Sequence, residues 1–246
     1  MRITHISDTH GNKINPGKAC DLLIHSGDIC RTRVHNLIPC VKSRTTGKIE
    51  PCGWQDPWNF RKIDKEAEAL AQTKDLLEQR DYLVNKKSLA VEDIVAVCGN
   101  HDFLTLEPIF PNSLTTGSRI IVVKGKKIGL LAGVLPIMGE WNDEIEEYDI
   151  LQRILALDRD IDILVSHVAP YGILDSAYGG MHTGSQELYQ AIFGKSVFDE
   201  QKPYFENLTL HCFGHSHEGK GKKKYEIDGR TIIFSNAACG RMNIEI

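Results

Sequence analysis

One stretch decides the fold class that this sequence predicts: DIVAVCGNHD, residues 93–102. Its first half is a short apolar run rich in β-branched residues, which is typical of a buried strand. Its second half is Gly99-Asn100-His101-Asp102. Turn chemistry accounts for an asparagine or an aspartate where a strand ends, but neither turn chemistry nor packing accounts for His101. The stretch therefore indicates a buried strand that ends in a functional loop.

The same arrangement, an apolar run followed by a polar cluster, recurs along the chain. The clusters are Asp8-Thr9-His10, Gly27-Asp28, His167 and Gly214-His215-Ser216-His217, after the runs 2–7, 21–26, 161–166 and 208–213. Carboxylate and carboxamide oxygens mixed with imidazole nitrogens suit Mn, Fe, Zn or Co, and strand ends hold ligands rigidly. The sequence therefore predicts one site for two divalent ions, with the candidate ligands Asp8, His10, Asp28, Asn100, His167, His215 and His217.

The remaining patterns mix strands with helices. Further strands are expected at 119–123 and 230–234, and Lys124-Gly125-Lys126 and Asp228-Gly229 predict two hairpin turns. Helical stripes of apolar residues lie within 62–84, around 151–155 and at 188–192, and Thr183 with Gln186 forms a candidate capping box for the third helix. This mixture predicts an α/β fold with both parallel and antiparallel strand pairs.

Composition limits the class of protein and its partners. The 246 residues are 41% hydrophobic and 25% charged, which suits a single domain over 1–246. The net charge of −4 gives no reason to expect nucleic acid as a partner, and no apolar run is long enough for a membrane span. Seven scattered cysteines favour reduced thiols and a cytoplasmic location. Oligomeric state is not predicted.

One region breaks the pattern. Residues 31–60 contain three prolines and no clear periodicity, so we expect an irregular insertion there. The insertion could cover the site as a lid, and a mobile surface excursion fits the sequence equally well. Three histidines, His5, His25 and His211, fall inside predicted strands and are interpreted as core residues rather than ligands.

Taken in order, the polar clusters resemble the calcineurin-like metallophosphoesterase superfamily. The resemblance runs from residue 8 to residue 217 and implies a four-layer α/β/β/α sandwich with two mixed sheets. It also implies two ligand sets that share Asp28 as a bridge. The first set is Asp8, His10, Asp28 and His217, and the second is Asp28, Asn100, His167 and His215. His101 would stay off the metals and act on the substrate.

A finer resemblance lies in the last third of the chain. Residues 166–175, 182–185 and 214–219 resemble the small phosphodiesterase-like branch, which includes metallophosphoesterase-domain proteins and relatives of the class III cyclic nucleotide phosphodiesterases. The protein Ser/Thr phosphatases are less similar, because the motif at Asp28 continues here without their second aspartate. The branch-specific segment places His182 at the substrate pocket.

These resemblances imply a phosphodiesterase acting on a small or nucleotide-like phosphoester. A hydroxide between the two ions would attack phosphorus, Asn100 would help to neutralise the phosphate oxygens, and His101 would protonate the leaving alkoxide as general acid. Asp102 is a candidate partner that holds the His101 ring. Asn100, His101 and His182 are the expected substrate contacts. A phosphomonoesterase or a nuclease on the same core remains open, as does a metal-binding scaffold without activity.

Overall fold

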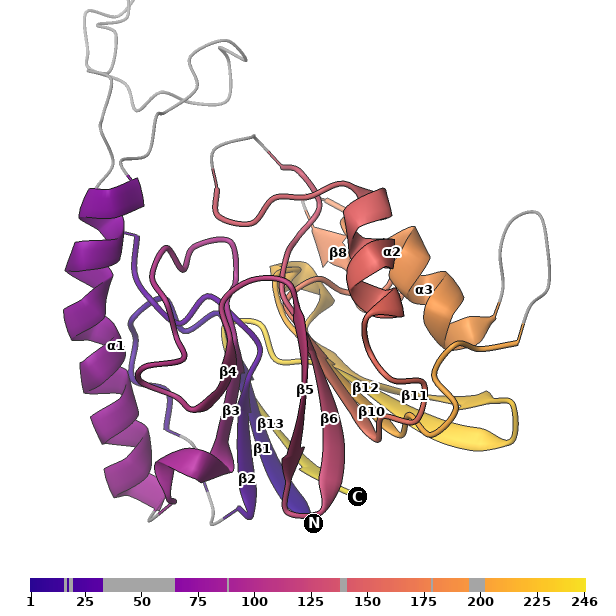
Figure 1. Ribbon diagram of the computed structural model, residues 1–246, viewed down its shortest axis with the longest axis horizontal. Helices are drawn as coiled ribbons and strands as arrows, with labels where there is room; N and C mark the ends of the chain where they lie inside the picture. The colour runs from indigo at the N-terminus through magenta and orange to yellow at the C-terminus, as the bar shows by residue number, and fades with distance from the viewer. Residues whose placement is uncertain are drawn as a thin grey trace, which may run out of the picture.

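The computed structural model describes residues 1–15, 17, 20–32, 65–87, 89–137, 141–177, 179–194 and 202–246. Two sheets pack face to face, and helices cover the outer face of each (Figure 1). This arrangement is the four-layer α/β/β/α sandwich that the sequence predicts. Of the expected insertion at 31–60, only Arg31 and Thr32 lie within the described residues.

The first sheet has the strand order β13-β1-β2-β3-β4. Its strands are β1 (Arg2–Ser7), β2 (Leu22–His25), β3 (Ile94–Val97), β4 (Asn112–Leu114) and β13 (Gly240–Glu245). Strands β1 to β4 are parallel, and β13 runs antiparallel to β1 at the edge. The predicted strands at 2–7, 21–26 and 93–98 are confirmed, with ends shorter by a residue in the last two.

The second sheet has the order β11-β12-β10-β7-β6-β5 and is also mixed. Its strands are β5 (Ser118–Val123), β6 (Lys126–Leu131), β7 (Ile163–Ser166), β10 (Leu210–Phe213), β11 (Gly221–Ile227) and β12 (Arg230–Asn236). Both predicted hairpins form, and the two residues of each turn have positive φ: Lys124 and Gly125, then Asp228 and Gly229. A separate ribbon pairs β8 (Ser176–Ala177) with β9 (Met181–His182).

Three helices complete the layers. α1 (Lys65–Lys87) covers the first sheet, and α2 (Glu147–Leu155) and α3 (Gln186–Phe193) cover the second (Figure 1). The candidate capping box is wrong. Ser185 caps α3 by accepting a hydrogen bond from Leu188 N, whereas the Thr183 hydroxyl donates to the carbonyl of Asp175. Within the described residues, no helix is long and apolar enough to cross a bilayer.

Buried apolar side chains form one cluster in each interlayer space. The middle cluster joins Ile3, Ile24 and Val95 of the first sheet to Val165 and Leu210 of the second. The outer clusters fix α1 on one side and α2 with α3 on the other. Removing such large apolar surfaces from water is the main stabilising contribution to a fold of this size.

Parallel strands of both sheets end at the same side of the sandwich. Strands β1, β2 and β3 of the first sheet and β7 and β10 of the second are followed there by the five polar clusters of the sequence. The side chains packed between the two sheets hold these strand ends close together at this edge. The topology alone therefore brings together loops that are up to about two hundred residues apart in the chain.

Candidate metal centre

The loops after β1 and β2 run side by side. The backbone N–H of Asp8 donates to Gly27 O (2.9 Å), and that of His10 donates to Asp28 O (3.0 Å). Asp8, His10 and Asp28 have left-handed backbones, with φ of 51°, 44° and 54°. Residues other than glycine rarely adopt this backbone conformation, and the strain that it causes concentrates at functional sites. The left-handed turns break the alternation of a strand, so Asp8 and His10 aim at the same place.

Glycines beside the motifs leave room for the polar side chains. A Cβ added to Gly99 would lie 2.2 Å from Asp28 Oδ1, and one added to Gly214 would lie 2.3 Å from Asp8 Oδ2. Gly27 has a φ of 105°, and a Cβ added there would lie 2.3 Å from Nδ1 of the His167 imidazole. Only glycine fits at these positions. The glycines of the sequence motifs are therefore part of the site.

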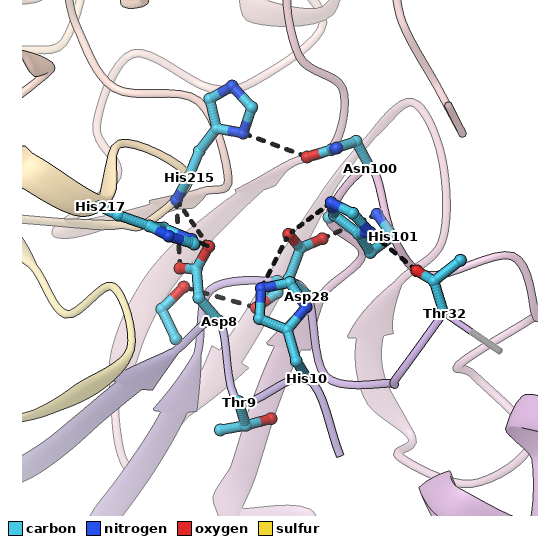
Figure 2. A network of polar contacts seen from close by, with 12 residues as sticks. Asp8, Thr9, His10, Asp28, Thr32, Asn100, His101, His215 and His217 are labelled. Atoms are coloured by element: carbon cyan, nitrogen blue, oxygen red, sulfur yellow. Dashed lines mark hydrogen bonds and ion pairs between the residues drawn. The ribbon is translucent and has the colours of Figure 1, made fainter. Parts of the chain in front are cut away.

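Asp28 lies at the middle of the cluster (Figure 2). Its Oδ2 is 3.4 Å from His167 Nε2, 3.9 Å from His10 Nε2 and 4.0 Å from His101 Nε2. Its Oδ1 accepts a hydrogen bond from His101 N at 2.8 Å. Burial alone would raise the pKa of Asp28, but the imidazoles of His167, His101 and His10 outweigh burial and lower it well below its ordinary value. Asp28 is therefore an ionised, buried carboxylate.

Asp8 is the second buried carboxylate. His217 Nε2 lies 3.1 Å from its Oδ1, and His215 N donates to both of its oxygens at 3.1 and 3.2 Å. The side chain of His215 extends toward Asn100, with 3.1 Å between Nδ1 and Oδ1 (Figure 2). Burial lowers the pKa of His215 to about 4, so its ring is neutral and carries a lone pair for a ligand.

His167 supplies the test of whether this site fits metal ions. Its Nδ1 donates to the carbonyl of Ser26 at 2.7 Å, which leaves Nε2 as the atom that faces Asp28. This Nε2 is fully buried and has no hydrogen-bond partner among the described residues. A buried orphan nitrogen is costly unless something absent from the polypeptide occupies it. A histidine fixed through its other nitrogen is the usual form of a metal ligand.

The structure brings all seven predicted ligands together. Two groups of ligand atoms lie within 4.8 Å of one another, Asp8 with His10 and His217, and Asp8 with Asp28 and His167. Asp8 belongs to both groups, and Asp28 also reaches His10. His215 adjoins His167, with 5.1 Å between their ring centroids, and Asn100 Oδ1 lies 3.1 Å from His215 Nδ1. The donor set fits two divalent ions, and the assignment of each ligand to one ion stays a prediction.

His101 is held from four sides. Its Nδ1 is 2.8 Å from Thr32 Oγ1, its carbonyl accepts from Gln72 Nε2 of α1 at 2.7 Å, and its ring is 4.1 Å from that of Trp141. The fourth contact is its N–H on Asp28. Nε2 is left facing the metal centre at 4.0 Å from Asp28 Oδ2. This geometry suits a group that acts on substrate beside the metals.

Asp102 has another role than the one its position in the motif suggested. Its fully buried carboxylate accepts hydrogen bonds from the backbone N–H groups of Ile29, Cys30 and Gly99 at 2.8 to 3.1 Å. It fixes the loop after β2 against the loop after β3. The expectation that Asp102 holds the His101 ring is therefore wrong, and Thr32 occupies that place.

A cavity of about 540 Å³ opens over the centre. Its polar side includes Asp28, Asn100, His101, His215 and His217. Its apolar side consists of Leu135, Pro136, Ile137, Trp141, Ala177 and Met181. His182 lies on the cavity wall, as the branch resemblance implied, and its role toward substrate stays a prediction.

Sequence reasoning missed three residues that shape this site. Thr32 was hidden in the irregular stretch, and Gln72 resembled any polar residue of an amphipathic helix. Trp141 stacks on His101 from a loop without a motif. Gln72 is fully buried in the structure and also accepts from Phe103 N at 2.8 Å, and nothing in the sequence signals this burial.

Fold and site together define a class of metal-dependent hydrolase built on a β-sandwich covered by helices. The family model described as calcineurin-like phosphoesterase matches residues 1–219, which is most of the chain. The chain belongs to the calcineurin-like phosphoesterase family. This family depends on dinuclear metal centres, and the match identifies the domain as a phosphoric ester hydrolase.

Solved structures with a similar arrangement are distant and mostly longer. The Haemophilus influenzae NAD nucleotidase NadN is 13% identical, with 99% of this chain and 46% of that chain covered and a TM-score of 0.44. A putative 5′-nucleotidase from Staphylococcus aureus is 11% identical, with coverages of 99% and 50% and a TM-score of 0.47. Vps29 of Entamoeba histolytica in complex with zinc is 16% identical, with coverages of 100% and 86% and a TM-score of 0.35.

The chain thus spans half or less of the length of the two nucleotidases. The comparison with curated proteins found none that matches the chain. The family model is therefore the finding that identifies the domain, and substrate and activity are taken up as proposals.

Proposed function

We propose that this domain hydrolyses phosphodiesters of small, nucleotide-like size. The observation that supports this proposal best is His101. Its ring is fixed by Thr32 and Trp141 while Nε2 faces a seven-residue donor set. A scaffold has no use for a fixed, unligated imidazole at this point. A hydrolase needs one to protonate its leaving group.

The residues of the chain divide the chemistry between them. Asp8, Asp28, His10, His167, His215, His217 and Asn100 would hold two divalent ions. When bound, these ions supply positive charge for the phosphoryl oxygens and acidify the attacking water. His101 Nε2 donates the proton that the departing alkoxide requires. Nδ1–H donates to the Thr32 hydroxyl both before and after this transfer, because the neutral ring that remains keeps its proton on Nδ1.

The cavity supports a substrate of limited size with an apolar part. Trp141 and Met181 line the cavity together with the residues of the metal centre. A planar group stacked near Trp141 would place its phosphoester near the metal centre, because aromatic faces attract other rings. The net charge of −4 does not favour a long nucleic acid over this opening. We therefore favour a small phosphodiester over a nuclease substrate.

Turnover of two chromogenic esters tests this proposal. Protein freed of metal and reloaded with manganese should hydrolyse bis-p-nitrophenyl phosphate with a higher kcat/KM than p-nitrophenyl phosphate. Without metal it should hydrolyse neither. A preference for the monoester would favour a phosphomonoesterase, and no turnover of either ester by metal-loaded protein would favour the scaffold.

A further inference from the structure

A second imidazole–carboxylate pair lies on the wall of the same cavity. Asp175 follows the left-handed residue Leu174, at φ 54°, and its side chain is only 1% exposed. Its Oδ2 accepts from Gly172 N at 2.9 Å and Gly184 N at 3.2 Å, and its Oδ1 is 2.8 Å from His182 Nδ1. Three hydrogen bonds of this kind stabilise an ionised carboxylate away from water.

His182 presents its other nitrogen to the cavity. Its side chain is 45% exposed, although its Nδ1 is fixed on a buried carboxylate. His182 Nε2 has no partner among the described residues, and the ring lines the cavity together with Asn100 and His101. The ring of Tyr171 supports it at 4.9 Å. A histidine that served only to hold a loop in place would bury its ring, because burial strengthens a hydrogen bond to a carboxylate.

The pair is tied to the metal centre without belonging to it. Thr183, the next residue, forms a hydrogen bond of 2.7 Å through its hydroxyl with Ser216, which stands between His215 and His217. Asn236 of β12 donates from Nδ2 to both Leu174 O and Ser216 O at 2.8 Å. The segment that carries Asp175 and the loop that carries His215 therefore share rigid partners. His182 is thereby held on the cavity wall beside the metal centre.

We propose that Asp175 and His182 form a second anion-binding subsite, which takes a phosphate group of the substrate other than the one that reacts. The proposal rests on the phosphodiesterase function and names the substrate class, a phosphodiester that carries a further phosphate. An anionic oxygen at Nε2 and the carboxylate at Nδ1 both interact favourably with a positive ring. The pair therefore attracts an anion that a neutral hydrogen-bond donor would bind less tightly.

The other charged groups near His182 are consistent with this role. Glu218 also lines the cavity, but its carboxylate oxygens accept from Gly179 N at 3.2 and 3.4 Å, so its charge is directed to the turn of the β8–β9 ribbon. The carboxylate of Asp175 is buried and bonded to His182 Nδ1, so its charge is already paired. His182 Nε2 is the donor that this wall offers to an incoming group.

A matched pair of esters measures the subsite. Thymidine 5′-(p-nitrophenyl phosphate) and its 3′-phosphorylated form share the leaving group and the nucleoside and differ by one phosphate. For manganese-loaded protein, we expect the 3′-phosphate to lower KM roughly tenfold, the size of one charge-assisted hydrogen bond. His182→Gln should bring the ratio of the two KM values close to one. His182→Arg, which keeps a cation, should retain part of the ratio.

Two further variants separate recognition from damage to the loop. Asp175→Asn keeps the size of the side chain and should reduce the ratio, because the ring loses its anionic partner. Met181→Leu changes a neighbour on the same wall and should preserve the ratio. Equal KM values for the two esters in the wild type, or an unchanged ratio in His182→Gln, would overturn the subsite.

Calorimetry separates this inference from the proposed function. Thymidine 3′,5′-bisphosphate should bind more tightly than thymidine 5′-monophosphate to the wild type, and His182→Gln should remove the difference. If the wild type hydrolyses neither ester but shows this difference, the subsite stands and the hydrolase does not. If it hydrolyses both esters with equal KM, the hydrolase stands and the subsite does not.

Discussion

The Thr32 hydroxyl lies 2.8 Å from Nδ1 of His101 and directs the opposite ring nitrogen toward the metal centre. A carboxylate at this position would favour the charged ring alone. The uncharged hydroxyl accepts from Nδ1–H both before and after Nε2 releases its proton, so the bond is kept as the proton leaves. Under the proposed function, in which His101 is the general acid, Thr32 is thus a positioning residue for it.

Thr32→Val should slow esters whose leaving group needs a proton. The isosteric side chain keeps the volume and removes one hydrogen bond, so kcat for diphenyl phosphate should fall by roughly tenfold. For bis-p-nitrophenyl phosphate, whose leaving group departs as a stable anion, the fall should be smaller. Thr32→Ser restores the hydroxyl and serves as the control. Equal losses on the two esters would show that Thr32 does not act through the proton donor.

His101→Ala should separate metal binding from turnover. His101 lies beside the donor set and lines the cavity next to it. We expect metal content by elemental analysis to stay at the wild-type value while kcat falls by about a hundredfold or more, which is typical for the loss of a general acid. A variant that binds less metal than the wild type would place His101 among the ligands instead.

Gly99→Ala should weaken metal binding without unfolding the protein. The new Cβ would lie 2.2 Å from Asp28 Oδ1 and 2.7 Å from His167 Nε2, so one of the two ligands must move. We expect weaker metal binding, seen as a higher chelator sensitivity, and little activity at limiting manganese. Gly129→Ala in β6 is the control, because the new Cβ would meet the flexible end of the Ile161 side chain, away from the site. It should lower thermal stability and keep metal affinity; equal metal loss in both variants would contradict this account.

The sequence predicted those features that depend on local pattern. Strand β1 and the loop of Asp8 and His10 follow from a short apolar run and the polar cluster behind it, and all seven predicted ligands converge. The sequence did not predict β13, because residues 240–245 form a strand only by pairing with β1 at the other end of the chain. The partner of His101 was missed for the same reason. Thr32 reaches it across 69 residues, whereas the adjacent Asp102 turns to backbone amides.

Core histidines make a further prediction about acid stability. His211 is fully buried, its Nε2 is 2.8 Å from Ser166 Oγ, and its Nδ1 has no partner among the described residues. Because the Ser166 hydroxyl donates to Val168 O, it accepts from His211, so Nε2 carries the proton. A second proton would have to be buried at Nδ1 without an acceptor. Burial and, to a lesser degree, His5 lower the pKa of His211 from 6.5 to about 3.

The sign of the effect follows from proton counting. Below pH 6.5 the unfolded chain binds a proton at His211 that the folded chain excludes, so the free energy of unfolding falls as the pH is lowered toward 3. The slope is about 1.4 kcal/mol per pH unit for each such histidine. His211→Leu should lower this slope by the contribution of one histidine, about 1.4 kcal/mol per pH unit. Leucine does not titrate, and Ser166 keeps its bond to Val168. Urea unfolding of chelator-treated protein between pH 7.5 and 4.5 measures it. Phe234→Leu, a buried neighbour that does not titrate, should lower stability at every pH and keep the wild-type slope; a His211→Leu slope equal to the wild type would refute the assignment.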